Sequence, residues 1–367
     1  MSGTSVDAVD AALVSFEQSI PRLHALHSQP IPANLKKTLL QSNQDPQLAL
    51  ATLCELQVTM AQLFATAVTQ LLAQQGLSAD QVCAIGSHGQ TLFHHPQAGM
   101  SLQIGHPAII AKHTKIPTAG DFRIDDMAIG GQGAPFAPVF HQVLFSQTHT
   151  PTLAVNIGGI ANISYLPAGD QANTGLLGWD TGPGNALLDE TCQRYFDQAY
   201  DAQGALSASG SCQSKLLDAL LTDNYFSQPT PKSTGRDYFN WQWLTQRAQL
   251  AGIPLESIPA QDLLCTLTEL TALSIVNAIK ALPDFHEVTN LWLCGGGALN
   301  TFLQTRLQYH LPSVEVKTSL DKGISPHAIE GMLFAWLAKQ RLEHRPVALH
   351  RVTGAKRDAI LGGLWLP

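Results

Sequence analysis

The chain has 367 residues, of which 45% are hydrophobic and 13% charged, and its net charge is −7. This composition is typical of a globular protein and excludes an intrinsically disordered one. The basic runs Lys36–Lys37 and Lys356–Arg357 are no longer than pairs, so we expect no nucleic-acid partner. The length exceeds that of most single cores and predicts two domains.

The cysteines, the histidines and the hydropathy of the chain indicate its cellular compartment. None of the six cysteines forms a Cys-x-x-Cys pair and most lie in apolar stretches, so we expect free, buried thiols rather than disulfides or zinc ligands. Histidines cluster only at His94–His95, which argues against a metal centre built from histidine. No signal peptide is recognisable, and Glu55 and Gln57 interrupt the longest apolar run before it reaches transmembrane length. We therefore expect a cytoplasmic protein without a membrane partner.

The first ten residues are small, hydroxyl-bearing and turn-prone, and a β-prone run follows at residues 11–14. This order favours a hairpin turn whose backbone N–H groups, with Thr4 and Ser5, face a phosphate. It also places Asp7 or Asp10 near a metal ion. An ordinary polar turn before a strand is the alternative interpretation.

The rest of the first half alternates between helical and strand patterns. Residues 48–72 predict a helix with one apolar face, residues 81–86 a buried strand, and residues 107–115 a second helix before a short strand into Asp121. The stretch 125–137 is rich in glycine and proline and is the expected loop and hinge.

The second half repeats the strand–turn–strand pattern. It first predicts two strands with a double-glycine turn over 152–164, a strand at 176–179, a turn at 180–184 and a helix over 186–196. A loop at 228–236, a helix over 263–282, a strand from Leu291 and a helix over 327–342 opened by Pro326 follow. The alternation of strands and helices predicts an α/β fold.

Glycine-rich turns adjoin apolar strands at three separate places, around Gly3, at Gly158–Gly159 and at Gly295–Gly297. Each turn taken alone is better explained as a tight connection between packed strands. Together they predict a nucleotide held between two similar lobes, because glycine lets the backbone approach a ligand closely.

These segments resemble the phosphate and adenosine motifs of the sugar kinase–Hsp70–actin superfamily. The resemblance is closer still to the anhydro-N-acetylmuramic acid kinase family and covers essentially the full length. The matching blocks are Met1–Asp10, Gly86–Thr91, Asp121–Arg123, Gly130–Pro135, Asn156–Asn162, Asp180–Pro183, Lys232–Arg236 and Val352–Ala355.

The resemblance implies two ribonuclease H-like lobes of the actin-like ATPase fold with an interlobe active-site cleft. Lobe I would comprise residues 1–135 and 326–367, and lobe II residues 136–325. It also implies a homodimeric, ATP- and Mg²⁺-dependent kinase in peptidoglycan recycling. Its reaction would open 1,6-anhydro-N-acetylmuramic acid and phosphorylate O6 to give N-acetylmuramic acid 6-phosphate.

Asp180 is the expected catalytic residue. A carboxylate beside Trp179 at the end of a predicted strand can accept a proton. The resemblance makes it the general base that activates the water attacking the anomeric carbon. The alternative is a carboxylate that only caps the following helix.

Arg123 and Glu330 are the next candidates. A functional arginine would bind the lactyl carboxylate or sugar oxygens through its planar fork of donors, and the resemblance places Glu330 near the substrate. The alternatives are that Arg123 pairs with Asp125 or Asp126 on the surface and that Glu330 faces water beside Lys339.

The remaining roles are those that the resemblance implies. Substrate contacts are assigned to His88, Gln90, Asp121, Arg123 and Glu330. Asp7 and Asp10 would hold Mg²⁺ against the phosphates, directly or through water. The predicted ATP-binding residues are Gly3, Thr4, Ser5, Val6, Asp7, Ala8, Val9, Asp10, Asn156, Gly158, Gly159, Gly295, Gly296 and Gly297.

Two features depart from the family pattern. The family usually has a short strand before the Met1 block, and without it we expect the Gly3–Asp10 turn to be tethered on one side only and to bind ATP more weakly. Ala8 stands where the family has glycine, which strains the turn if that position needs a positive φ.

Two other function classes remain open at this point. A glycoside hydrolase would use paired carboxylates and act without ATP. A non-catalytic ATP-binding switch of the actin–Hsp70 type would bind ATP without phosphorylating a sugar. ADP release that depends on the sugar separates the kinase from both.

Overall fold

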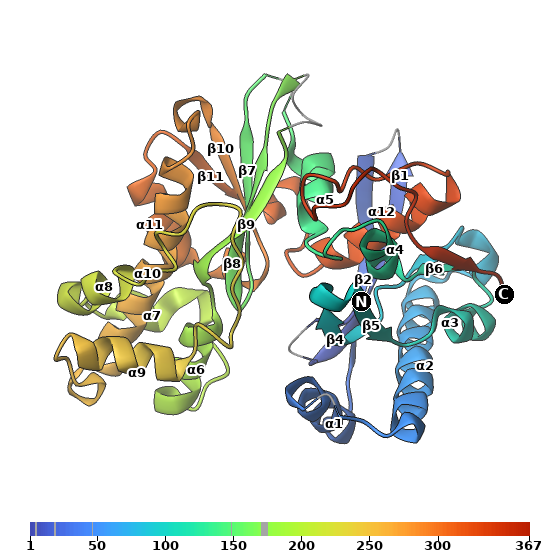
Figure 1. Cartoon of the computed structure of the whole chain (residues 1–367), viewed down its shortest axis with the longest axis horizontal. Helices are drawn as coiled ribbons and strands as arrows, with labels where there is room; N and C mark the ends of the chain where they lie inside the picture. The colour runs from blue at the N-terminus through green and yellow to red at the C-terminus, as the bar shows by residue number, and fades with distance from the viewer. Residues whose placement is uncertain (4–5, 18–19, 46, 148, 170–174) are drawn as a thin grey trace. The chain divides into compact units, whose positions relative to one another are not determined.

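The computed structural model describes residues 1–3, 6–17, 20–45, 47–147, 149–169 and 175–367. The chain divides into two compact units, which are described separately. Unit 1 comprises Met1–Leu144 and Ala328–Pro367, and unit 2 comprises Phe145–His327. Helices and strands alternate in both units, which confirms the α/β class (Figure 1).

Unit 2 contains a five-stranded sheet with the order β11-β10-β7-β8-β9. Strand β8 is antiparallel to both of its neighbours, whereas β10 is parallel to β7 and to β11. This is the strand order of a ribonuclease H-like sheet, and it brings the carboxyl ends of β7, β9 and β10 to one edge. The strands are β7 (Thr152–Ile157), β8 (Ile160–Leu166), β9 (Leu177–Pro183), β10 (Asn290–Cys294) and β11 (Glu315–Thr318).

Helix α10 (Ala260–Lys280) organises the core of unit 2. Its C-terminal half packs with the apolar side chains of the sheet, and its N-terminal half packs with a cluster of helices. The predicted helix over 263–282 is therefore confirmed. The other helices of this unit are α6 (Ala186–Phe196), α7 (Ala205–Ser209), α8 (Ser214–Leu221), α9 (Trp241–Leu250) and α11 (Thr301–His310).

The strands of unit 1 form three smaller sheets. They are the hairpin of β1 (Ala8–Glu17) and β2 (Ile20–Pro30), the hairpin of β4 (Gln90–His95) and β5 (Met100–Ile104), and a sheet with the order β12-β6-β3. In that third sheet, β3 (Ile85–Gly86), β6 (Thr118–Gly120) and β12 (Gly363–Trp365) are all short. The buried strand predicted over 81–86 thus forms only at its last two residues.

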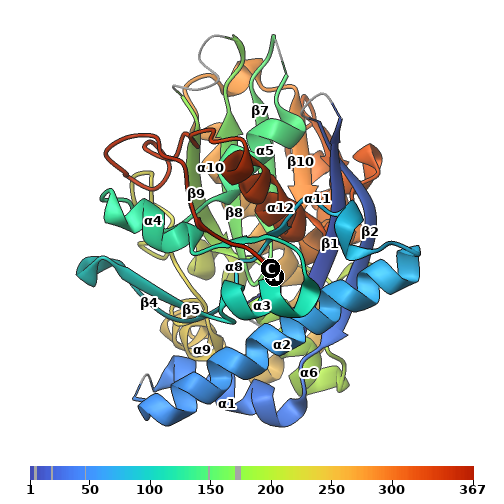
Figure 2. The ribbon, with the colours of Figure 1, turned by 90° about the vertical axis from the view of Figure 1, so that its right-hand side faces the viewer.

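The helices of unit 1 cover these sheets. Helix α2 is a single long helix beside α3 (Figure 2) and ends at Gly76, which adopts a left-handed conformation. The two helices predicted in this region, over 48–72 and 107–115, are confirmed. The helices are α1 (Ala33–Gln44), α2 (Leu50–Gln75), α3 (Pro107–Thr114), α4 (Phe122–Ala128), α5 (Ala137–Phe145) and α12 (Ile329–Leu342).

The predicted loop and hinge at 125–137 is wrong in its first part, because α4 continues to Ala128. The loop that follows is fastened within unit 1 by Asp126, whose carboxylate accepts hydrogen bonds from the Gly133 N–H at 2.8 Å and the Thr353 hydroxyl at 2.7 Å. A buried carboxylate bonded on both oxygens holds this loop in place within unit 1, and the hinge role stays a prediction.

The N-terminal turn is held from both sides, contrary to the expectation of a single tether. Ser2 forms a β-bridge with Val9, and Met1 exchanges two backbone hydrogen bonds with Asp10 at 2.8 and 2.9 Å. Ala8 has no positive φ, so its side chain introduces no strain; among the described residues of this turn Val6 is left-handed, with φ 54°. The predicted phosphate contacts Thr4 and Ser5 lie outside the described residues.

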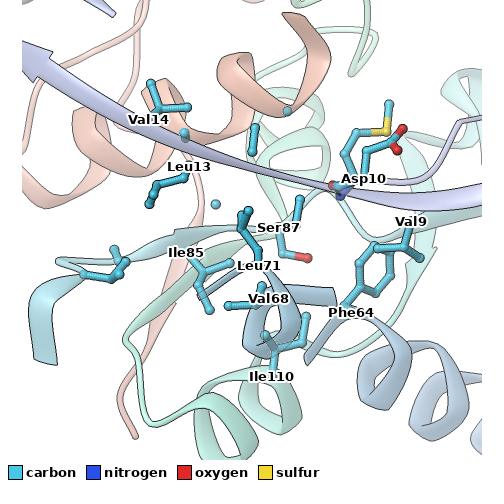
Figure 3. Close-up of a pocket in the computed structure, with 18 of the residues that line it drawn as sticks. Val9, Asp10, Leu13, Val14, Phe64, Val68, Leu71, Ile85, Ser87 and Ile110 are labelled. Carbon is cyan, nitrogen blue, oxygen red and sulfur yellow. Dashed lines mark hydrogen bonds between the residues drawn. The ribbon is translucent and has the colours of Figure 1, made fainter. Parts of the chain in front are cut away.

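Unit 1 also contains a cavity of about 100 Å³ between β1 and β3 (Figure 3). Among the described strands, β1 pairs in its sheet with β2 and β3 pairs with β6, so the two sheets do not join across this space. Side chains of α2 such as Phe64 and Leu71 line it, and the lining is mostly apolar. Of the carboxylates predicted to act in catalysis or metal binding, only Asp10 reaches it.

Two expectations about composition need correction. Helices α2 and α10 are long and apolar enough to cross a membrane, but 78% of the apolar window of α10 is buried within unit 2, and α2 supplies core side chains to unit 1. All six cysteines are free as expected, yet only Cys192, Cys265 and Cys294 are buried.

Gly86 tests the close packing of β3 against α12. A Cβ at this position would lie 1.8 Å from the backbone oxygen of Phe334, so Gly86→Ala forces the two elements apart. We expect a loss of about 3 kcal/mol in the free energy of unfolding of unit 1, measured by calorimetry. Gly76→Ala is the control, because its surroundings are open and only its φ of +65° is unfavourable, at a cost of about 1 kcal/mol. Equal losses in the two variants would contradict this packing.

Candidate active site

Asp180 lies in the middle of the edge strand β9, opposite Asn162 of β8. The turn predicted at 180–184 is wrong, because the strand continues to Pro183. A loop covers the outer edge of the strand at this point: the Asp180 N–H donates to the Lys232 carbonyl at 3.0 Å, and the Tyr225 hydroxyl donates to the Asp180 carbonyl at 2.8 Å.

The carboxylate of Asp180 is held at one oxygen only. The Thr234 N–H donates to Oδ2 at 2.9 Å, whereas Oδ1 accepts no hydrogen bond from the described residues. Burial raises the pKa of Asp180 above its ordinary value, and the Thr234 hydrogen bond offsets part of that rise. The helix-cap interpretation is wrong, since α6 begins after Asn185 and no side chain caps it.

The double-glycine turn Gly158–Gly159 is joined to the start of α6. Its two carbonyls accept hydrogen bonds from the N–H groups of Gly184, Asn185 and Ala186 at 2.8–3.1 Å. The Gly159 N–H donates to no acceptor among the described residues. The carbonyls of this turn therefore cap the start of α6, and the Gly159 N–H remains a free backbone donor that can bind an anion.

The glycine turn after β10 packs directly on the first one. A Cβ at Gly295 would lie 2.5 Å from the Asn156 side-chain oxygen, and a Cβ at Gly297 would lie 2.3 Å from Ile157, so only glycine fits at both positions. The structure thus brings Asn156 and both predicted glycine turns of this unit together at the carboxyl edge of the sheet.

Sequence reasoning assigned no role to several residues of this edge. The side-chain amide of Asn185 donates to the Ile157 carbonyl at 3.2 Å and so links β7 to α6. The ammonium of Lys232 donates to the carbonyls of Tyr225 and Phe226 and lies 4.6 Å from the Tyr225 ring centroid. Asn185 follows the Asp180–Pro183 motif after one intervening glycine, and Lys232 opens its own motif, so both motifs carried an unused signal.

In unit 1, Arg123 lies on α4 and is fixed by two hydrogen bonds. Its Nε donates to His88 Nε2 at 2.9 Å and its Nη1 donates to the Gly133 carbonyl at 3.1 Å. The surface pairing with Asp125 or Asp126 is therefore wrong. The Nη2 group donates to no acceptor within the described parts of the chain, so one arm of the fork is open.

His88 holds Arg123 through a defined tautomer. Its Nε2 must be unprotonated to accept from Arg123, and its Nδ1 lies 2.9 Å from the Gly89 carbonyl, to which it donates. Burial, followed by the charge of Arg123, lowers the pKa of His88 well below 6.5. The ring is consequently a neutral support for the arginine.

Glu330 joins this group from α12. Phe334, one turn further along the helix, has its ring centroid 4.7 Å from that of His88. The Glu330 side chain is accessible to solvent but crowded by protein atoms, and this crowding raises its pKa. The charges of the Met1 amino group and of Arg123 partly offset that rise. The alternative position beside Lys339 is wrong, because Lys339 pairs with Glu343 at 2.7 Å.

Two further predicted substrate contacts lie in the same unit. Gln90 begins β4 and is buried, and its Oε1 atom has no hydrogen-bond partner within the described residues. A buried acceptor without a donor is costly, and a ligand hydroxyl would satisfy it. Asp121 precedes α4 with a left-handed φ of 60°, and burial is the main cause of its raised pKa.

Comparison with known proteins decides the family. The family model for anhydro-N-acetylmuramic acid kinase matches residues 1–367. The enzyme of that name from Hydrogenovibrio crunogenus is 48% identical over 100% of this chain and 97% of its own length, and the one from Coxiella burnetii is 45% identical over 100% and 96%. The chain belongs to the anhydro-N-acetylmuramic acid kinase family.

Among solved structures, the activator of 2-hydroxyisocaproyl-CoA dehydratase from Clostridium difficile with bound ADPNP has a TM-score of 0.40 at 10% identity. That alignment covers 76% of this chain and 83% of the activator, and a likeness this distant adds nothing to the fold described above. Membership of the family makes the protein a kinase that uses ATP.

A kinase needs a divalent cation at its phosphates, and Asp7 and Asp10 are the predicted ligands. Asp7 is exposed and forms an ion pair with Lys36. Asp10 accepts from the Ser28 hydroxyl with one oxygen, and its second oxygen accepts from no described side chain. The described residues contain no cluster of three metal-binding side chains. Asp10 therefore fits a Mg²⁺ ion that keeps most of its ligands from phosphate and water.

His88 has a testable effect on stability. Because its pKa is lowered in the folded kinase, the unfolded chain binds more protons below pH 6.5, and the free energy of unfolding falls as the pH drops, by up to about 1.4 kcal/mol per pH unit. His88→Gln should remove this part of the slope. Calorimetry of both proteins between pH 7 and pH 5 measures it, and identical slopes would show that His88 titrates normally.

Proposed function

We propose that this kinase hydrolytically opens 1,6-anhydro-N-acetylmuramic acid and transfers a phosphoryl group from ATP to O6, giving N-acetylmuramic acid 6-phosphate. Water adds at C1 as the C1–O6 bond breaks, and O6 attacks the γ-phosphorus of ATP. The same proposal makes the enzyme cytoplasmic and homodimeric, with a role in peptidoglycan recycling.

The observation that carries this proposal is the hydrogen bonding and burial of the Asp180 carboxylate. One carboxylate oxygen is oriented by the Thr234 N–H, and the other accepts no bond from the described residues. Burial raises the pKa of the group, which makes the carboxylate a stronger base than a solvated aspartate. An oriented carboxylate with a free oxygen can remove a proton from a water molecule.

The other residues of unit 2 support phosphoryl transfer. The Gly159 N–H is a free donor, and the turn at Gly295–Gly297 has no side chain that would exclude a nucleotide. Mg²⁺, for which Asp10 is the candidate ligand, would neutralise charge on the phosphates when bound. Donors of this kind stabilise charge that develops during transfer without having to reorganise.

In unit 1, the open arm of Arg123 suits the lactyl carboxylate or a sugar oxygen. Neutral His88 fixes the guanidinium without competing for the anion. The unpartnered Gln90 Oε1 can accept from a sugar hydroxyl, and Glu330 can do the same while its charge balances Arg123.

Sugar-dependent release of ADP tests the reaction. With ATP, Mg²⁺ and the anhydro sugar together, we expect stoichiometric ADP and a sugar 6-phosphate. With ATP alone we expect negligible ADP. Sugar opening without ATP would support a hydrolase, and ATP binding without any sugar phosphate would support a switch; either result contradicts the proposal.

Asp180→Asn removes the base while keeping the size of the side chain. We expect turnover to fall by about 10²–10⁴-fold, with the dissociation constants for ATP and sugar changed little. Asp218→Asn, an exposed position on α8, is the matched control and should keep full turnover. Near-normal turnover of the Asp180 variant would remove this residue from the mechanism.

A further inference from the structure

Arg236 lies against the double-glycine turn of unit 2, and neither the sequence motifs nor the proposed chemistry gave it a role. A Cβ at Gly159 would lie 2.3 Å from Arg236 Nε and 2.5 Å from Nη2. The guanidinium therefore rests directly on the backbone of the turn, in space that any residue other than glycine would occupy.

The position of Arg236 is set by the same loop that orients Asp180. The loop is anchored to β9 by the Asp180 N–H bond to Lys232 and the Thr234 N–H bond to the Asp180 carboxylate. Arg236 follows two residues after the second anchor. Its place next to Gly159 is thus fixed by backbone hydrogen bonds to the proposed general base.

The guanidinium of Arg236 has unused hydrogen-bond donors. The side chain is exposed and makes no hydrogen bond or ion pair to any residue that the structure describes. Its charge acts on Asp189, in the first turn of α6: burial raises the pKa of that carboxyl to about 6, and Arg236 opposes the rise. An arginine whose five N–H donors have no acceptor among the described residues can bind an oxyanion.

A second unused hydrogen-bond donor lies beside Arg236 and also favours an anion. The Gly159 N–H lacks an acceptor among the described residues, and the turn adjoins the N-terminus of α6. The Gly295–Gly297 turn packs on the Asn156–Ile157 end of β7, so the open glycine backbone of two turns lies next to this donor pair. Backbone donors and a planar cation on glycine turns fit a phosphate group.

We propose that Arg236 and the Gly159 N–H together bind a phosphate group of the nucleotide. This inference rests on the proposed kinase function but concerns binding alone. It assigns Arg236 a direct electrostatic contact with the anion, with the Asp180-anchored loop as the positioning element.

Calorimetric titration of ATP, of adenosine and of the anhydro sugar into the wild type, Arg236→Ala and Arg236→Lys tests the proposal. We expect ATP to bind about 10- to 100-fold more weakly to Arg236→Ala, with partial recovery in Arg236→Lys, because a charge-assisted hydrogen-bonding group is lost. Adenosine, which has no phosphate, should bind all three equally. Arg194→Ala is the matched control: Arg194 is an exposed arginine of α6 already paired with Glu190, and its loss should leave ATP affinity unchanged.

Each other outcome overturns the assignment. Unchanged ATP affinity means that Arg236 does not touch phosphate, and an equal loss for adenosine means that the substitution only disturbs the fold. A loss confined to the anhydro sugar assigns the residue to the lactyl carboxylate instead. These titrations measure binding and not turnover. If the separate turnover assay failed while ATP bound normally, the proposed function would be contradicted and this inference would stand.

Discussion

Two hydrogen bonds between Asp180 and the backbone of one loop determine the candidate site of unit 2. One runs from the Asp180 N–H to Lys232 and the other from the Thr234 N–H to the Asp180 carboxylate. They tie a loop without regular secondary structure to the exposed edge of β9, where unpaired backbone groups would otherwise face solvent. The orientation of the proposed base, the Lys232 contacts with Tyr225 and Phe226 and the position of Arg236 all depend on this attachment.

The site residues of unit 1 depend on a comparable balance of charge and burial. Arg123 is buried, which disfavours its charge, and the nearby carboxylate of Glu330 compensates. Burial of Glu330 raises its pKa, and Arg123 opposes that rise. His88 stays neutral and supplies an acceptor without adding charge. Removing one member leaves the others in an unfavourable environment, so the three act as a unit.

Local patterns in the sequence were sufficient to predict the glycine turns and most helices, because periodicity and turn chemistry act over a few residues. The role of Asp180 came from the family resemblance and stays a prediction. Contacts between distant segments could not be predicted in this way. Arg123 and His88 are 35 residues apart, and Thr234 and Asp180 are 54 residues apart. For the same reason the surface pairing of Arg123 and the helix-cap role of Asp180 were wrong, as was the single tether of the N-terminal turn, which Ser2 closes by a bridge to Val9.

The central claim is that the fold keeps Asp180 as an oriented carboxylate of raised basicity. The most direct measurement is a ¹³C NMR titration of protein labelled at the aspartate side-chain carboxyl carbon, with the Asp180 resonance assigned by its absence from the Asp180→Asn spectrum. The account predicts a pKa above the ordinary value of 3.8, since burial outweighs the Thr234 hydrogen bond. A pKa at or below 3.8 would show that hydrogen bonding dominates and would contradict the account.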